Sequence, residues 1–101
     1  MLVAFSIFPV GAAESLSSEV VKIIDIIDKS GLSYKMSAMS TTVEGEWDEI
    51  MALINKCRLK LKENNNRIYL NLVMDDRTDA TDRLKGKVDS IENKLNRDVK
   101  K

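Results

Sequence analysis

The chain has 101 residues, 44% of them hydrophobic, which is enough for one domain with one core and leaves no room for a second. Its 16 basic and 16 acidic side chains cancel, so no global field attracts the protein to nucleic acid or to an anionic membrane. No histidine is present, which removes the commonest general base and the usual zinc ligand. We therefore expect one domain over residues 1–101, without a metal site or catalysis, that acts through a local site.

The first ten residues are mostly apolar. Residues 2–10 are rich in β-branched and aromatic types and run into Pro9 and Gly11, which predicts a strand followed by a loop. The run imitates a secretory signal, but no Lys or Arg precedes it, and no other stretch has the roughly 18 apolar residues of a membrane span. Because the single cysteine, Cys57, lies within a helical apolar pattern, we expect a buried thiol and a cytoplasmic protein without a disulfide.

Two helices and two short strands are predicted next. A helix with Ser17 as its N-cap is indicated by the apolar spacing of Val20, Ile23, Ile24 and Ile27, and Ser30-Gly31 ends it. Strands are expected from Ser33 to Met39 and from Thr41 to Gly45, paired as a hairpin. The second helix is indicated by a repeat of apolar residues at Trp47, Ile50, Met51, Ile54, Cys57 and Leu61.

The last third of the chain predicts one more strand and one more helix. Asn64-Asn65-Asn66 stops the second helix, and residues 67–74 alternate as a fourth strand. A third helix is predicted from a narrow apolar stripe at Leu84, Val88, Ile91 and Leu95. The order strand, helix, strand, strand, helix, strand, with an additional C-terminal helix, is that of a ferredoxin-like α+β sandwich.

In such a sandwich the two helices cover one face of the sheet, and the opposite face has a mixed composition. If the alternation holds through each strand, the outer face carries Ser6, Phe8, Ser37, Thr42, Glu44, Tyr69 and Asn71. This mixture is neither a core nor an ordinary solvated surface. It suits a subunit interface or a platform for a ligand.

The most informative stretch runs from Thr41 to Glu49, where a strand with hydroxyls and a carboxylate turns directly into a helix. Glu44 could accept from an amino group or balance a cationic ring, and Trp47 or Phe8 could offer an aromatic face. The alternative is structural: the threonines are good strand formers, the acidic residues favour a helix N-terminus, and Trp47 belongs to the core. A cofactor-free oxygenase or isomerase that uses Glu44 with Tyr69 also stays open, although the lack of histidine weakens it.

Several motifs in order resemble the small thiamine-binding proteins of the YkoF-like group. They are Phe8-Pro9-Val10-Gly11, Ser15-Leu16-Ser17, Ser30-Gly31-Leu32-Ser33-Tyr34, the stretch from Thr41 to Glu49, and Asp75-Asp76-Arg77, which together span nearly the whole chain.

The resemblance implies a ferredoxin-like fold, assembly into homodimers or homotetramers, and non-catalytic binding of thiamine or hydroxymethylpyrimidine as a carrier, buffer or sensor. No other cofactor is implied. The ligand-binding residues expected from it and from the residue chemistry are Phe8, Ser17, Ser37, Thr41, Thr42 and Glu44. The competing hypothesis is a structural or regulatory homo-oligomer that binds no small molecule.

Overall fold

The computed structural model describes residues 1–11, 16–78, 83–84, 91 and 94–95, with the side chains of residues 16 and 17 excepted. Its elements are β1 (Leu2–Pro9), α1 (Leu16–Lys29), β2 (Ser33–Met36), β3 (Thr41–Glu44), α2 (Trp47–Lys62) and β4 (Ile68–Asp75). The strands form one antiparallel sheet in the order β2-β3-β1-β4. The predicted α+β class is confirmed, and the arrangement is consistent with a ferredoxin-like fold.

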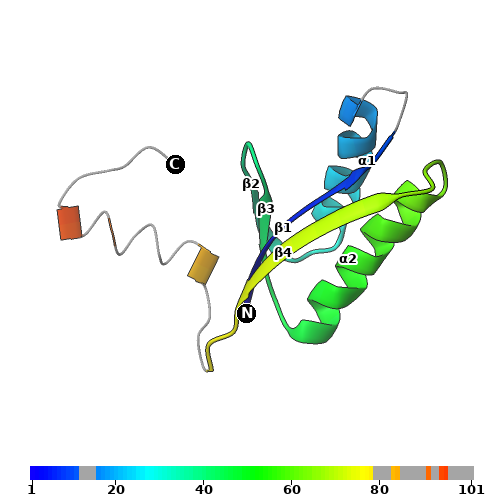
Figure 1. Cartoon of the computed structure of the whole chain (residues 1–101). Coiled ribbons are helices and arrows are strands. Elements are labelled where there is room, and N and C mark those ends of the chain that lie inside the picture. Colours follow the sequence, from blue (N-terminus) through cyan, green and yellow to red (C-terminus); the bar gives the residue numbers. More distant parts are fainter. Residues whose placement is uncertain (12–15, 79–82, 85–90, 92–93, 96–101) are drawn as a thin grey trace.

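Both helices lie on the same side of the sheet (Figure 1). Phe5 pairs with Thr41 on one side and with Leu72 on the other, and paired residues project to the same face of a sheet. Phe5 is buried in the core together with residues of both helices, so its partners Thr41 and Leu72 also project toward the helix layer. The next pairs along the sheet, including Ala4 with Thr42, project to the outer face.

The core lies between this sheet and the two helices. Its buried side chains are Val3, Phe5, Ile23, Ile27, Val43, Ile50, Leu53, Ile54, Cys57 and Leu61. Trp47 is not part of it, because it is the first residue of α2 and is 54% exposed. The interpretation of Trp47 as a core residue is therefore wrong.

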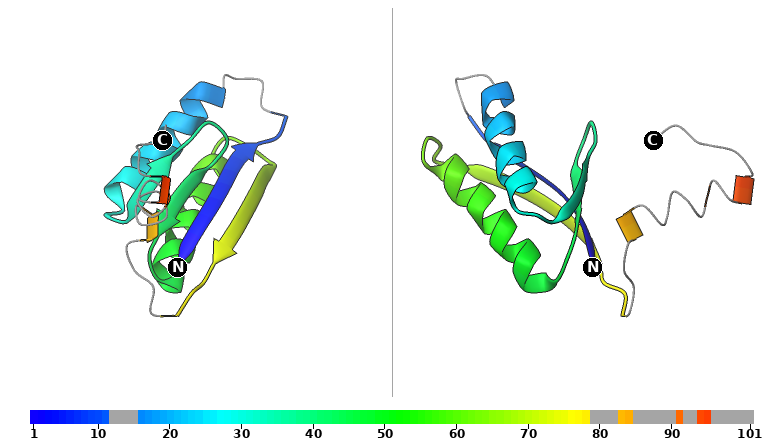
Figure 2. Two further views of the ribbon diagram at one scale, coloured as in Figure 1. Left: turned by 90° about the vertical axis from the view of Figure 1, so that its left-hand side faces the viewer. Right: turned by 180° about the vertical axis from the view of Figure 1, so that it is seen from behind.

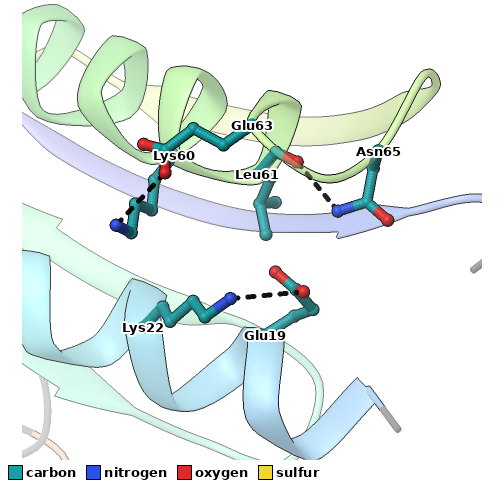
Figure 3. A network of polar contacts seen from close by, with 6 residues as sticks. All are labelled: Glu19, Lys22, Lys60, Leu61, Glu63 and Asn65. Atoms are coloured by element: carbon teal, nitrogen blue, oxygen red, sulfur yellow. Dashed lines mark hydrogen bonds and ion pairs between the residues drawn. The ribbon is translucent and has the colours of Figure 1, made fainter. Parts of the chain in front are cut away.

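Two of the predicted helix ends are confirmed, and one predicted helix start is wrong. Ser30 Oγ donates to the Ile27 carbonyl at 2.6 Å and Gly31 has φ +81°, as expected for a helix that ends there. At the end of α2 the Asn65 side chain donates to the Leu61 carbonyl at 2.8 Å (Figure 3). The N-cap prediction for Ser17 is wrong, because α1 already begins at Leu16 and residue 17 belongs to its first turn.

The predicted C-terminal helix falls mostly outside the described residues, and Val88 is among those left out. Arg83, Leu84, Ile91 and residues 94–95 have helical conformation. Figure 2 places residues 83–84, in orange, on the side of the sheet opposite to α1 and α2. Among the described helices, none is long and apolar enough to cross a bilayer.

Cys57 is fully buried, as predicted, and burial raises the pKa of its thiol to about 11. We expect no reaction of the native protein with a disulfide reagent at pH 8, and release of one thiol equivalent after denaturation. Because the folded state disfavours the thiolate, the free energy of unfolding should be unaffected below about pH 9 and should fall as the pH rises toward 11. Rapid labelling of the native protein would contradict the buried position.

Candidate functional site

The structure places the expected ligand-binding residues in several different parts of the molecule. Phe8, Thr42 and Glu44 project to the outer face, as expected from the alternation. Thr41 projects toward the helices and is 8% exposed. Ser37 lies on neither face, because β2 ends at Met36 and not at Met39 as predicted. The expected outer-face position of Ser37 is therefore wrong.

Along the strands, Glu44 and Phe8 lie at opposite ends of the sheet. Glu44 pairs with Leu2, whereas Phe8 pairs with Tyr69. The six steps along β1 from Leu2 to Phe8 rise about 3.3 Å each, so roughly 20 Å separates the two positions. Glu44 and Phe8 cannot hold the same pyrimidine ring within one subunit. Because Tyr69 lies beside Phe8, the same distance excludes Glu44 and Tyr69 as an acid-base pair within one subunit.

Glu44 has partners within the protein that the sequence did not indicate. Its two carboxylate oxygens accept from the main-chain N–H groups of Arg83 at 2.9 Å and Leu84 at 3.2 Å. The Arg83 guanidinium donates to Asp75 at 2.5 Å, and this hydrogen bond raises the pKa of Arg83. Glu44 thus holds the main chain of Arg83 and Leu84, where the described C-terminal segment starts, against the outer face. Main-chain donors leave no signature in a sequence, so periodicity could not have found this contact.

At the opposite end of the outer face, Phe8 stacks on Tyr69 with ring centroids 5.5 Å apart and an interplanar angle of 28°. Both rings remain partly exposed. The alternation in the sequence placed both residues on this face, but only the strand register makes them neighbours. The pair offers a flat aromatic surface to a ligand or to another subunit.

On the helix side of the sheet, a hollow of about 160 Å³ lies between α1 and the turn that joins β2 to β3. Its walls are mainly apolar, and several hydroxyl-bearing residues line it. The residues that matter for a ligand are Phe5, Ile24, Met36, Ser6, Ser37 and Thr41. Among the described residues that line the hollow, none carries a side chain that titrates near neutral pH.

Ser37 is held in place by the turn itself. Its main-chain N–H and its hydroxyl both donate to the carbonyl of Ser40, each at 2.9 Å. The hydroxyl oxygen keeps its lone pairs for a donor from a ligand. Residue 17, whose side chain is outside the described part, lies in the first turn of α1, shortly before Val20, which lines the hollow. Of the six expected residues, Ser37 and Thr41 are brought together here.

Metal binding finds no support in the described residues, which contain no group of three acidic, cysteine or histidine side chains able to hold an ion. The described residues of the hollow and of the outer face offer hydrogen bonds and apolar or aromatic contact.

The family model described as "Thiamine-binding protein" matches residues 3–92. The chain belongs to this thiamine-binding protein family. It is 33% identical to a UPF0045 protein of Mycobacterium bovis over 96 residues, which cover 94% of each chain. It is also 36% identical to a UPF0045 protein of Eremothecium gossypii over 96 residues, or 93% of this chain and 91% of the other. The resemblance inferred from the motifs is confirmed.

Solved structures extend the family relationship to the fold. A protein of Methanocaldococcus jannaschii superposes with a TM-score of 0.80 at 29% identity, covering 89% of this chain and 93% of the other. A Thermotoga maritima protein, whose name proposes a role in thiamine biosynthesis or salvage, gives 0.78 at 26% identity, covering 89% and 96%. The sheet and helices described above are thus shared with experimentally determined family structures.

Proposed function

We propose that the protein binds thiamine or its hydroxymethylpyrimidine part without transforming it, as a carrier, buffer or sensor. The observation that carries this proposal is the thiamine-binding family model, whose match over residues 3–92 includes all of the sheet except its first residue, and the hollow. The described residues that line the hollow include no general acid or base, which agrees with the proposed non-catalytic role. The name of the Thermotoga maritima relative points to the same area of metabolism.

The pyrimidine ring is proposed to lie in the hollow between α1 and the β2–β3 turn. At about 160 Å³ the hollow is smaller than the roughly 300 Å³ of pockets for drug-sized ligands, so it suits a single ring. The Ser37 hydroxyl, which donates its proton to Ser40, can accept from the exocyclic amino group, and the Thr41 hydroxyl can donate to a ring nitrogen. Phe5 and Met36 supply apolar contact. The thiazolium of thiamine would remain outside, where solvent or a second subunit meets it.

Assembly into homodimers or homotetramers, with a ferredoxin-like subunit that adds a C-terminal helix, belongs to the same proposal. It is supported by large apolar side chains that stay exposed on β4 and on the described part of the C-terminal segment. These are Tyr69, Leu70, Leu72, Val73, Ile91 and Leu95. A cytoplasmic location is proposed with it.

The neighbouring threonines of β3 give a matched test. Replacing Thr41 by valine removes a hydroxyl from the hollow and keeps the side-chain shape. Thr42→Val makes the same change on the outer face. We expect Thr41→Val to weaken thiamine binding about fivefold, the effect of losing one hydrogen bond worth roughly 1 kcal/mol, and Thr42→Val to leave it within twofold. Calorimetric titration with thiamine and with hydroxymethylpyrimidine measures both.

Two results would contradict the proposal at different levels. If neither compound gives heat or a thermal shift at millimolar concentration, the protein does not bind thiamine. If binding occurs but Thr42→Val weakens it and Thr41→Val does not, the ligand lies on the outer face and not in the hollow.

A structural or regulatory homo-oligomer without a ligand is the second candidate function, because the Glu44 carboxylate already has protein partners. In this case Glu44→Gln should change the assembly and no variant should reveal a binding site. Mass measurement in solution, together with the titrations above, separates the two candidates.

A further inference from the structure

A groove of about 300 Å³ lies where the end of α2 meets the start of β4. It is lined by Arg58, Lys62, Asn66, Arg67, Ile68 and Leu70. Three of these six residues are cationic and none is acidic. Since the whole chain has a formal net charge of zero, this concentration of positive charge is local to the groove.

Among the described residues, these three cations have no carboxylate partner, whereas four other cations do. Lys22, Lys29, Lys60 and Arg83 are each paired with an acidic residue. In the described part of the chain, no such pair involves Arg58, Lys62 or Arg67. Arg58 donates through Nε and Nη2 to the neutral Asn55 Oδ1, at 3.1 and 2.8 Å. This contact orients the guanidinium without neutralising it.

The helix dipole explains only part of the cluster. Cations in the last turn of α2 are favourable near its carbonyl end, and Lys62 is one of them. However, the Leu61 carbonyl is already capped by Asn65, and Lys60 already pairs with Glu63 (Figure 3). Arg67 lies beyond the helix, at a position fixed by the Val10 N–H, which donates to its carbonyl at 2.9 Å. The dipole gives no reason for a cation there.

The groove has the donors that a phosphate group requires. Arg58 and Lys62 are four residues apart on α2, so they share one helix face, and their like charges repel each other unless an anion is bound. Guanidinium groups bind phosphate oxygens with two parallel hydrogen bonds, and the Asn66 amide can add another donor. Ile68 and Leu70 offer apolar contact to the organic part of a ligand.

We propose that this groove binds the phosphate group of a small phosphorylated molecule. The groove contains none of the residues that line the hollow, so its occupation does not depend on thiamine binding.

Titration with inorganic phosphate, pyrophosphate and glycerol phosphate, at constant ionic strength in chloride, tests the proposal. We expect saturable binding, weakened about three- to tenfold by Lys62→Gln and by Arg67→Gln, and lost in the double variant. Arg67→Lys keeps the charge but removes the planar donor pair, so it should weaken binding less than Arg67→Gln. Stronger binding of glycerol phosphate than of inorganic phosphate would identify an organic phosphate as the ligand class. Equal binding of the two would mean that the groove recognises the free phosphate anion, and it would overturn the proposal that the ligand is an organic phosphate.

Lys56→Gln is the matched control, because it removes one charge from the same helix outside the groove. It should leave phosphate affinity within twofold. Absence of saturable binding to the native protein, or equal weakening by Lys56→Gln, would overturn the site. Binding of a single-stranded oligonucleotide at concentrations where glycerol phosphate does not bind would overturn the small-molecule assignment. The substituted side chains are exposed, so unchanged melting temperatures are expected and confirm that the variants are folded.

Discussion

Replacing Ile27 by alanine is expected to lower the free energy of unfolding by about 2–5 kcal/mol. Ile27 is fully buried and lies in the core with Val3, Val43 and Ile50. Its truncation removes three carbons from contact with both the sheet and α2, and the surrounding elements cannot close the space completely. For a small domain this is a large share of the total stability. Urea unfolding followed by circular dichroism measures the change.

Val21→Ala provides the comparison on the same helix. Val21 is 67% exposed, so its substitution should change the free energy of unfolding by no more than about 0.5 kcal/mol. Similar losses for the two variants would mean that α1 does not pack on the sheet in the described orientation. The slope of the unfolding free energy with urea should stay the same in both, since neither change alters the surface exposed on unfolding.

Glu44→Gln is expected to release the start of the C-terminal segment from the outer face. Glutamine keeps one acceptor oxygen but loses the charge, and its amide group would face an N–H donor of Arg83 or Leu84. Hydrogen bonds to a charged acceptor contribute roughly 1.5–3 kcal/mol each when they are shielded, and partial exposure of this site reduces that value. We expect amide exchange of residues 83 and 84 to accelerate at least tenfold, measured by nuclear magnetic resonance.

Glu63→Gln is a suitable control, because the Glu63 side chain is exposed and its ion pair in the described part of the chain is with Lys60 on the same helix end. Amide exchange at residues 83 and 84 should not change in this variant. If Glu44→Gln keeps its thiamine affinity, the result agrees with a ligand in the hollow. If the affinity is lost, the result indicates that the ligand binds on the outer face. Unchanged exchange in Glu44→Gln would contradict the contact itself.

The order of elements was predictable because each has a distinct local pattern. The apolar spacing of α1, the alternation of β4 and the Ser30-Gly31 helix end all follow from backbone geometry and side-chain burial. The errors lie where tertiary contacts decide. Ser37 leaves the strand because its hydrogen bonds to Ser40 close a turn, and periodicity does not encode that choice.

The candidate site was predictable in chemistry but not in geometry. Strand alternation correctly placed Thr42 and Glu44 on the outer face, but it did not show that Thr41 meets Ser37 in a hollow beside α1. Strand register alone separates Glu44 from Phe8. The basic groove was missed for a similar reason, since Arg58 and Arg67 become neighbours only when α2 packs beside β4.

β4 is an edge strand of the sheet, and its exposed edge makes the protein prone to aggregation. Its outer main-chain groups have no neighbouring strand in the described part of the chain, and apolar side chains project from both of its faces. Such a border is a template for unintended strand addition and for insoluble association, which natural proteins usually prevent with charges or proline. Between Ile68 and Met74 this strand has neither. Protection of β4 must therefore come from another subunit or segment that covers this edge. If the cover is a second subunit, the concentration of the protein sets how long a newly made chain is exposed to aggregation.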